Sequence, residues 1–511
     1  MPIDLHTYQQ AAIDKFFGNN GNLLVALPVG LGKTVVGLSI IKRIFEKEGS
    51  DLKVLIIVPA DLRFNFKDSI TQFKLTDIKT TIVTDKNLFE QEYEQNNVII
   101  VSYNFMIMYS DIIIKHKFRL LIIDEMHRSK NHQVITYQTL SKVRKDIPMM
   151  LGLTASFFSN TMVEFLALIS IISRDQRIIR FANQFIKMGF ANKPGLLAQI
   201  FLGAKPSSPI PIGIKNINTF KNLVGKWIYI PSEETLRAVG HGPKPVQQTV
   251  QVEITKLEFD AYMYALGKLP KQYAQKILKN ELSETDLRVI GKAFIMVIQQ
   301  VLLSPDYIST REPTRARPGS KINWIADKIQ NTTNKSIVFT PFSIFGAQLM
   351  NRTLRERGIE TRLYTGDVSK EERARIRNEF ENGNVQTLCL TAAGTEGLNL
   401  PSCNEVYFLS MTYNPEVMEQ VMGRALRITS HNDHVDIWYL IAKFHNKSTI
   451  DSNILRIAEN KKLMKKAIIK VLGESDELVD ENTAAGLASG QSYETLDKKT
   501  PIIPVVYPNE R

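Results

Sequence analysis

The chain has 511 residues, of which 64 are lysine or arginine and 52 are aspartate or glutamate, so its formal net charge is +12. This length is enough for about three or four domains of ordinary size. A hydrophobic fraction of 44% and a charged fraction of 23% are those of a soluble globular protein. The excess of positive charge favours a polyanionic partner such as nucleic acid, although charge alone does not separate this from simple solubility.

The cysteine count and the apolar pattern exclude several classes of protein. Cys389 and Cys403 are the only cysteines, and two are too few for a disulfide framework or a zinc site, which is typical of a reducing compartment. No apolar stretch reaches membrane-spanning length, and the N-terminal MPIDLHTYQQ lacks the apolar core of a signal peptide. We therefore expect an intracellular, soluble protein with no membrane partner.

The stretch 23–34, LLVALPVGLGKT, predicts a buried strand, a glycine turn and the start of a helix. Gly30 and Gly32 would let consecutive backbone N–H groups point at phosphate oxygens, and the helix would add its positive N-terminal end. Lys33 would reach the β- and γ-phosphates of ATP, and the Thr34 hydroxyl would bind Mg²⁺. The alternative is an ordinary glycine turn with a surface lysine, but the motif favours phosphate binding.

Apolar runs alternate with helical patterns through the first part of the chain. Uninterrupted apolar strands of this kind predict a parallel sheet that is covered by helices on both faces. In such a sheet the ligand lies at the carboxyl ends of the strands, where most polar motifs of this region fall. The expected strands are Leu23–Leu27, Val54–Val58, Thr80–Val83, Val98–Val101, Leu120–Ile123 and Met149–Leu153.

Asp124 and Glu125 directly follow the strand that ends at Ile123. A buried carboxylate is costly without a partner, and an Mg²⁺ ion held by Thr34 and the nucleotide would supply one. Asp124 would then bind the metal, and Glu125 would activate the attacking water. A surface acidic turn is the alternative, which the phosphate loop upstream disfavours.

Three further polar positions extend this site. His127 follows the acidic pair and could connect the nucleotide site to the turn that contains Thr154 and Ser156. A lone histidine is, however, more often a hydrogen-bonded structural residue. Gln9 precedes the phosphate loop, and its amide can both donate to and accept from the adenine edge, whereas out of context it would be a surface residue.

These motifs resemble those of a known family. The ordered set of Tyr8–Gln9, GLGKT, VPA at 58–60, DEMH and GLTAS at 152–156 resembles the first motor lobe of superfamily 2 helicases. The stretch 153–172, LTASFFSNTMVEFLALISII, is similar to a turn and a leucine-rich helix of the Swi/Snf-type DNA translocases. The triplet LPV at 27–29 and the turn TAS depart from the usual sequence of that group.

The second half of the chain repeats the strand–helix alternation. Gln420, Arg424 and Arg427 lie at i, i+4 and i+7 of a predicted helix and therefore on one face. Two always-charged guanidinium groups suit a triphosphate across an interlobe cleft, and such groups are worth roughly 10³ to 10⁵ in rate in phosphoryl-transfer enzymes. A solvated basic helix is the alternative. The expected strands are Ser336–Thr340, Thr361–Tyr364, Thr387–Leu390, Glu405–Leu409 and His434–Leu440.

The alternation stops between residues 173 and 317, where the sequence resembles the helical protrusions that Swi/Snf-like enzymes carry between their lobes. The segment 309–320, STREPTRARPGS, is a basic linker whose arginines could contact phosphates or remain solvated. The elements expected before the linker are a helix marked by Phe181, Phe185 and Phe190, a strand at 246–254, and helices at 257–279 and 283–303.

Residues 435–470 resemble the end of the Swi/Snf motor, and RITSH at 427–431 is similar to helicase-like ATPases of large DNA viruses. The resemblance implies an α/β fold with two RecA-like parallel-sheet lobes in tandem, a mainly helical insertion between them and a C-terminal brace helix. The implied divisions are an ATP-binding lobe 1 at 1–172, a helical protrusion and linker at 173–317, lobe 2 at 318–445, a brace helix at 446–471 and a disordered acidic and polar tail at 472–511.

The resemblance also implies a role for each motif residue. Nucleic acid would be held by backbone amides and hydroxyls near Pro59, Ser102, Thr340 and Thr391, and such contacts position a strand without reading its sequence. Nucleotide binding is implied for Tyr8, Gln9, Gly30, Gly32, Lys33, Thr34 and Gly397, catalysis for Lys33, Asp124, Glu125, Gln420, Arg424 and Arg427, metal binding for Thr34 and Asp124, and coupling for His127, Thr154 and Ser156.

The function implied first is that of a monomeric, ATP- and Mg²⁺-dependent translocase on double-stranded DNA, which remodels protein–DNA or branched-DNA complexes. It would act in the nucleus or cytoplasm of the cell, or in a virion if the protein is viral. Two alternatives remain: a strand-separating DNA or RNA helicase, including a viral transcription-associated ATPase, and a nucleic-acid-binding scaffold with a silent ATPase site. We recognise no separate strand-splitting domain, which favours the translocase.

Overall fold

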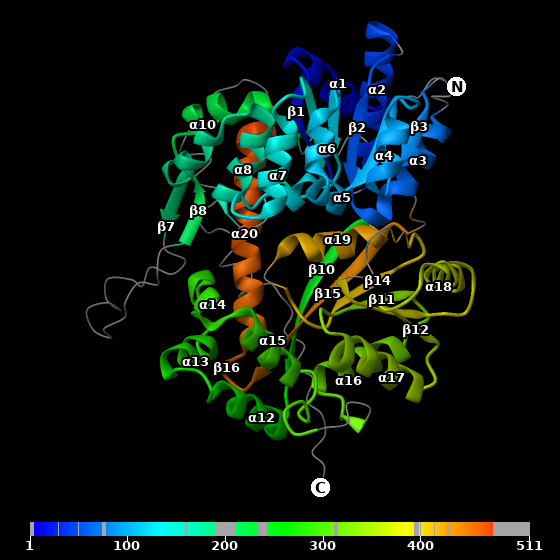
Figure 1. Ribbon diagram of the computed structural model, residues 1–511. Coiled ribbons are helices and arrows are strands. Elements are labelled where there is room, and N and C mark those ends of the chain that lie inside the picture. The colour runs from blue at the N-terminus through cyan, green and yellow to red at the C-terminus, as the bar shows by residue number, and fades with distance from the viewer. Residues whose placement is uncertain are drawn as a thin grey trace. The chain divides into compact units, whose positions relative to one another are not determined.

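The computed structural model describes residues 5–28, 30–49, 51–73, 78–158, 161–189, 210–232, 235, 243–310, 315–392, 398, 400–412, 414–426, 430 and 432–473. The chain divides into two compact units (Figure 1). Unit 1 comprises residues 1–188, 211–240 and 463–489, and unit 2 comprises residues 189–210, 241–462 and 490–511. Each unit is built around its own parallel β-sheet.

The sheet of unit 1 has seven strands in the order β3-β4-β2-β5-β6-β1-β9, and all of its neighbouring strands pair in parallel. The apolar runs of the sequence form its centre, as expected for strands that are buried on both faces. The strands are β1 (Asn22–Ala26), β2 (Val54–Val58), β3 (Thr80–Ile82), β4 (Val98–Ser102), β5 (Leu120–Ile123), β6 (Met149–Thr154) and β9 (Ile228–Tyr229).

Helices cover both faces of this sheet. Alternate residues of a strand accordingly belong to two different hydrophobic cores, one on each face. Val25, Ile56 and Ile122 belong to the core that also contains residues of α1, α2 and α3. Leu24 and Ile57 belong to the core on the other face, with residues of α5 to α8. The helices are α1 (Thr7–Gly18), α2 (Lys33–Glu48), α3 (Arg63–Gln72), α4 (Lys86–Tyr93), α5 (Tyr103–Met108), α6 (Ser110–Lys115), α7 (Ile135–Arg144), α8 (Met162–Ser173) and α10 (Ile217–Val224), with shorter 3₁₀ turns η1 (Ala60–Leu62), η2 (Met126–Ser129) and η4 (Gly225–Trp227).

The sheet of unit 2 has the order β10-β15-β14-β11-β13-β12, with the short β16 antiparallel to β15. Its other pairs are parallel, so the prediction of two parallel-sheet α/β lobes is confirmed. The strands are β10 (Lys244–Glu253), β11 (Ser336–Phe339), β12 (Thr361–Tyr364), β13 (Thr387–Leu390), β14 (Glu405–Phe408), β15 (His434–Phe444) and β16 (Lys447–Ser448).

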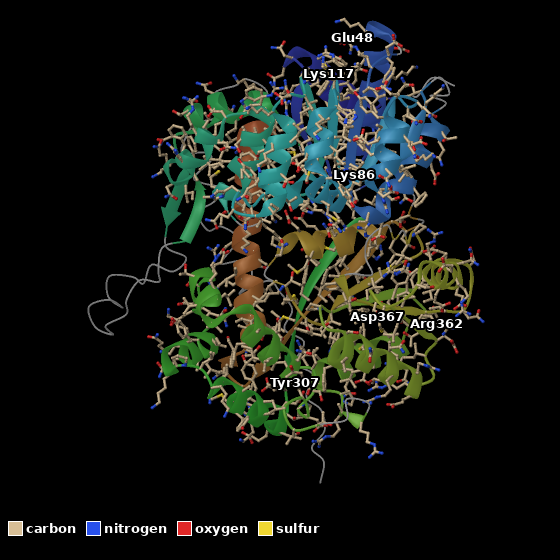
Figure 2. The ribbon with its side chains drawn as sticks, in the orientation of Figure 1. Glu48, Lys86, Lys117, Tyr307, Arg362 and Asp367 are labelled. Carbon is tan, nitrogen blue, oxygen red and sulfur yellow. The ribbon has the colours of Figure 1, made fainter. Side chains whose placement is uncertain are left out.

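The helices of unit 2 pack around this sheet, and charged pairs fix some of them to it. Arg362 of β12 lies 3.0 Å from Glu379 of α18 (Lys370–Asn382), and Arg362 is labelled in Figure 2. The other helices are α12 (Lys256–Leu266), α13 (Lys271–Leu278), α14 (Glu284–Ile290), α15 (Lys292–Val301), α16 (Ser320–Gln330), a π-helical turn η6 (Ser343–Gln348), α17 (Leu349–Glu356) and α19 (Pro415–Ala425).

The segment between the two sheets differs from the prediction in three places. Phe181 lies in a 3₁₀ helix, η3 (Gln176–Gln184), that is followed by strand β7 (Ile186–Gly189), so the single aromatic helix was wrong. Phe185 is buried between these elements and packs against Phe220, which explains the break, and Phe190 lies outside the described residues. Strand β7 pairs with β8 (Ile210–Ile214) in a separate two-stranded sheet.

The two long helices expected at 257–279 and 283–303 are each divided. The first ends at Leu266 and resumes after Pro270, which has no backbone N–H to continue a helix. The second is interrupted at Gly291, whose φ of +87° lies outside the helical region. Strand β10, by contrast, forms close to the expected residues and joins the second sheet beside β15.

The C-terminal helix α20 (Ile450–Gly473) forms as expected for a brace helix. Its residues up to Lys462 belong to unit 2 and the following ones to unit 1. Ile450 and Ile454 are buried in a core of unit 2, and Ile468 and Val471 are buried in a core of unit 1. Within the described residues, no helix combines the length and the apolar character that crossing a bilayer requires.

Candidate ATP and nucleic-acid sites

The phosphate loop follows β1 and runs into α2, as the sequence predicts. Gly30 and Gly32 both have positive φ angles, +87° and +73°, which suit glycine. The Nζ atom of Lys33 lies 3.2 Å from the carbonyl oxygen of Leu27 and 3.4 Å from that of Pro28, so the ammonium group sits within the curl of the loop. Thr34 follows in the first turn of α2 and is half-buried.

Tyr8 and Gln9 contact this loop from α1. The Tyr8 hydroxyl donates to the Leu31 carbonyl at 3.1 Å, and the Gln9 amide donates to the same oxygen at 3.3 Å. Gln9 also accepts a hydrogen bond from the His6 backbone. Both Tyr8 and Gln9 are buried, so the Gln9 side chain is a fixed neighbour of the loop, and its contact with adenine stays a prediction.

The acidic pair lies at the carboxyl end of β5, which one intervening strand separates from β1 and the phosphate loop. Strand β6 lies between β5 and β1, and the Leu27 N–H donates to the Thr154 carbonyl at the end of β6. Burial, together with the neighbouring charge of Glu125, raises the pKa of Asp124 to about 6, and the charge of Lys33 opposes this rise. Lys33 and Asp124 therefore act on one another electrostatically, which brings the two motifs into one site.

Tyr103 positions the acidic pair, a role that no motif of the sequence predicts. Its hydroxyl donates to the backbone carbonyls of Asp124 at 2.8 Å and of Glu125 at 3.1 Å. Burial raises the pKa of Tyr103 well above its ordinary value, so the group stays a neutral donor. Glu125 has a φ of +51°, which is unusual for a residue other than glycine, and these two hydrogen bonds hold that turn.

The residues predicted to couple nucleotide and nucleic acid lie in a row beside Glu125. The Nδ1 atom of His127 lies 3.2 Å from a carboxylate oxygen of Glu125 and 3.4 Å from the Thr154 hydroxyl. The Ser156 backbone N–H donates to the same hydroxyl at 3.0 Å. The structure thus brings Glu125, His127, Thr154 and Ser156 into continuous polar contact, although their part in coupling stays a prediction.

The residues at this edge fit the phosphates of a nucleotide with Mg²⁺. A Cβ atom on Gly32 would lie 2.4 Å from the Gln9 amide nitrogen, so only glycine leaves room there. Asp124 supplies a carboxylate that is buried beside a lysine, which suits a divalent ion and its anionic ligand. Among the described residues, no group of three or more His, Cys, Asp or Glu could hold a metal, so Mg²⁺ here would need phosphate oxygens and water as further ligands.

The arginine motif of unit 2 lies only in part within the described residues. Gln420 and Arg424 lie one turn apart on α19, and Arg424 donates to the Leu398 carbonyl at 3.3 Å. The described helix ends at Ala425, and the placement of Arg427 on the same face stays a prediction. Arg427 and Gly397 themselves lie outside the described residues.

The four residues predicted to hold nucleic acid end their strands as expected but are buried. Pro59 follows β2, and Ser102 ends β4, directly beside it in the sheet. The Ser102 hydroxyl accepts the Phe105 N–H and caps α5. Thr340 and Thr391 are 0% and 7% exposed. Phosphate contacts near these positions would therefore come from exposed neighbours, and the four assignments stay predictions.

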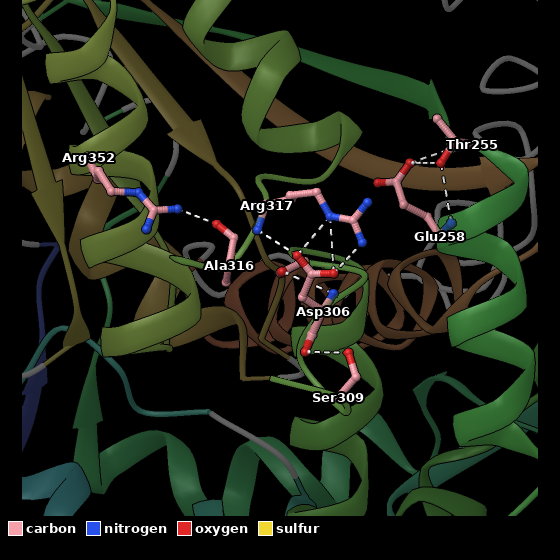
Figure 3. A network of polar contacts seen from close by, with 8 residues as sticks. Thr255, Glu258, Asp306, Ser309, Ala316, Arg317 and Arg352 are labelled. Atoms are coloured by element: carbon pink, nitrogen blue, oxygen red, sulfur yellow. Dashed lines mark hydrogen bonds and ion pairs between the residues drawn. The ribbon is translucent and has the colours of Figure 1, made fainter. Parts of the chain in front are cut away.

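The linker before α16 is held by charged contacts (Figure 3). Arg317 donates through Nε to Asp306 at 2.9 Å, and the hydrogen bonds from this guanidinium keep the pKa of that carboxyl below the ordinary value. Arg352 donates to the Ala316 carbonyl. Arg317 therefore has a carboxylate partner within unit 2, whereas Arg311 lies outside the described residues.

Two family models match this chain, one in each half. Residues 2–159 match the model described as "Type III restriction enzyme, res subunit". Residues 320–429 match the model described as "Helicase conserved C-terminal domain". The first match contains the phosphate loop and the acidic pair, and the second contains Gln420 and Arg424.

Curated relatives resemble the chain over most of its length. It is 25% identical to "Uncharacterized ATP-dependent helicase YqhH" of Bacillus subtilis, over 90% of this chain and 78% of that protein. It is 23% identical to "Putative ATP-dependent RNA helicase L538" of Acanthamoeba polyphaga mimivirus, over 87% of this chain and 90% of that protein. It is also 23% identical to "SWI/SNF chromatin-remodeling complex subunit snf22" of Schizosaccharomyces pombe, over 89% of this chain but only 27% of that protein.

One solved structure covers both halves of the chain. It is described as "Sulfolobus solfataricus SWI2/SNF2 ATPase core in complex with dsDNA". The match covers 93% of this chain and 98% of that one, with 17% sequence identity and a TM-score of 0.40.

Proposed function

The chain is a Swi/Snf-like member of the superfamily 2 helicases, and from that premise we propose that it hydrolyses ATP in order to move along double-stranded DNA and remodel protein–DNA or branched-DNA complexes. The observation that carries this proposal is that the charges of Lys33 and Glu125 both act on the buried Asp124 at one edge of the first sheet. That arrangement supports phosphoryl transfer to water. The formal net charge of +12 supports binding to a polyanion such as DNA.

The chain's own residues would share the work as follows. Lys33 and the loop N–H groups bind the phosphates, and Thr34 and Asp124 hold Mg²⁺, which when bound neutralises charge on the phosphate oxygens. Glu125 orients the attacking water and accepts its proton. His127 contacts Glu125 and Thr154, so a displacement of the turn at Thr154 would move His127 and with it the carboxylate of Glu125, the general base. Arg424 is proposed to stabilise the charge of the transition state.

The first experiment measures phosphate release with and without blunt double-stranded DNA. We expect the duplex to accelerate hydrolysis and Lys33→Ala to abolish it, because the variant loses the cation at the phosphates. Lys42→Ala is the matched control, since Lys42 lies on the same helix but is exposed and pairs with Glu46. A rate of hydrolysis that does not change when the duplex is added, or that persists in Lys33→Ala, would contradict the proposed translocase. A chain that binds DNA without any hydrolysis would be a scaffold.

The second experiment separates translocation from strand separation. A triplex-forming oligonucleotide placed on a duplex should be displaced in an ATP-dependent way, while the strands of a forked duplex stay paired. The Lys33→Ala variant should displace nothing. Separation of the fork by the unaltered chain would instead support an unwinding helicase, and the YqhH and L538 relatives are named as helicases.

A further inference from the structure

Helix α18 carries arginines of two kinds. Arg375 donates through Nε to Glu372 at 2.9 Å and lies 3.7 Å from Glu379, so its charge is compensated on the helix itself. Arg373 and Arg377 lie one turn apart on the same helix. Within the described residues, neither of them forms an ion pair with a carboxylate. Their charges are therefore available to a ligand, whereas that of Arg375 is not.

Arg373 is held over the turn that follows β12. Its guanidinium lies 5.7 Å from the centre of the Tyr364 ring. It donates to the carbonyl oxygens of Thr365 at 3.0 Å and of Gly366 at 3.2 Å. Its Nε atom is buried and has no hydrogen-bond partner among the described residues. The side chain is thus fixed in place by the turn and the ring, with part of its donor capacity unused.

The charges of Arg377 on α18 and Arg424 on α19 also act on Tyr364. Burial raises the pKa of the Tyr364 hydroxyl, and the charges of Arg373, Arg377 and Arg424 oppose that rise. Tyr364 ends β12 and is paired with Leu390 of β13. Leu390 is the last residue of β13, so this turn lies at the carboxyl edge of the second sheet, where α18 packs against β12 (Figure 1).

We infer that Arg373, Arg377 and Arg424 form one phosphate-binding cluster at this edge of unit 2, in which the exposed Arg377 contacts the ligand. Like charges brought together repel one another unless an anion joins them, and the guanidinium fork matches phosphate oxygens with two parallel hydrogen bonds. The ligand is a phosphate, carried either by a nucleoside triphosphate or by a nucleic-acid backbone. The choice between these two sources rests on the proposed function, whereas the cluster does not.

The test compares Arg377→Gln with Arg375→Gln. The two residues share a helix and an exposed position, and they differ in whether a carboxylate compensates the charge. Three probes are used. Binding of inorganic tripolyphosphate is measured by the rise in the melting temperature of the protein. Binding of a blunt 30-base-pair duplex is measured by fluorescence anisotropy over a range of salt concentrations, and use of ATP is measured by the KM for hydrolysis. For tripolyphosphate, both variants and their reference chain also carry Lys33→Ala, because the phosphate loop of unit 1 would otherwise bind this probe. We expect Arg377→Gln to lose most of the remaining protection.

The other two probes identify the source of the phosphate. If the backbone of DNA is the ligand, Arg377→Gln weakens duplex binding about three- to tenfold and lowers the slope of log K against log salt by about 1. If the nucleotide is the ligand, the KM for ATP rises by a similar factor and duplex binding is unchanged. Both results support the cluster.

An Arg377→Gln variant that matches Arg375→Gln with all three probes would overturn the inference. The inference and the proposed function fail separately. A chain without duplex-stimulated hydrolysis, in which Arg377→Gln alone loses tripolyphosphate protection, would refute the motor and keep the phosphate site. Duplex-stimulated hydrolysis with equal behaviour of the two variants would keep the motor and refute the site.

Discussion

The Nζ atom of Lys321 lies 2.7 Å from a carboxylate oxygen of Asp451, and both side chains are completely buried. Lys321 also donates to the Leu409 carbonyl at 2.9 Å, and Asp451 accepts the Ala442 N–H at 3.1 Å. Lys321 is the second residue of α16 and Asp451 the second of α20. The pair therefore joins the start of α16 to the start of α20 inside unit 2.

Removing one member of this pair should leave an uncompensated buried charge. We expect Lys321→Met to lower the free energy of unfolding of unit 2 by about 3–5 kcal/mol. Urea unfolding followed by the fluorescence of Trp324 and Trp438, which lie in unit 2, measures this loss. Lys256→Met is the control, because Lys256 and Asp260 form an exposed pair and such pairs contribute about 1 kcal/mol or less. Equal losses in the two variants would contradict the argument.

Gly32→Ala should impair nucleotide binding more than Gly30→Ala. Both glycines have positive φ, so alanine is strained at either site. A Cβ at Gly32 would in addition meet the Gln9 amide at 2.4 Å, whereas at Gly30 it would meet no atom of the described residues within 4 Å. We expect the KM for ATP to rise at least tenfold in Gly32→Ala and only a few-fold in Gly30→Ala, measured in the same phosphate-release assay. The reverse order would show that the contact with Gln9 does not shape the loop.

The sequence predicted the sheets well because their strands are continuous apolar runs. Strands β2 and β5 have the predicted bounds, since Val54–Val58 and Leu120–Ile123 are flanked by residues of other kinds. Strand β9 was not predicted, because two residues, Ile228 and Tyr229, carry no readable pattern. It forms through its non-local pairing with β1.

The sequence predicted the residues of the candidate site whose side chains carry the chemistry. It did not predict the residues that hold the backbone of the site in place. Lys33, Asp124 and His127 come together as their motifs indicate. Tyr103 could not be predicted, because its hydroxyl contacts backbone carbonyls from a different strand of the sheet. Arg377 was also missed, since helix α18 is charged along its whole length. The ion pairs of Arg375 distinguish it from Arg377, which forms no ion pair within the part of the chain that the structure describes.

Glu125→Gln should slow hydrolysis without weakening ATP binding. The variant keeps the size of the side chain and loses the carboxylate that would accept a proton from water. We expect kcat to fall about 10²- to 10⁴-fold with a KM for ATP within about twofold of the unaltered chain, because Glu125 is not expected to contact the nucleotide. Glu46→Gln, at an exposed position on α2, should leave both constants unchanged. A large rise in KM with little change in kcat would assign Glu125 to binding.

The stability of unit 1 without nucleotide and Mg²⁺ should depend on pH through Asp124. The pKa of this carboxyl is about 6 in the folded chain against an ordinary value of 3.8, so the folded form binds its proton more tightly than the unfolded form. The contribution of Asp124 to stability is therefore most favourable below about pH 4 and is lost as the pH rises through about 6. Between these limits the cost of ionisation amounts to about 3 kcal/mol.

Asp124→Asn tests this directly, because the amide oxygen can still accept the Glu125 N–H, which lies 3.0 Å from Oδ1 of Asp124, but the side chain cannot ionise. We expect the variant to be more stable than the unaltered chain at pH 7.5, by up to about 3 kcal/mol, and equal to it near pH 4. Urea unfolding followed by the fluorescence of Trp227 in unit 1 measures the difference. Asp14→Asn is the control, since the hydrogen bond from Gln10 keeps the pKa of Asp14 below its ordinary value. This control should gain nothing at pH 7.5, and an Asp124→Asn variant that also gains nothing would mean that the carboxylate is not buried as the fold requires.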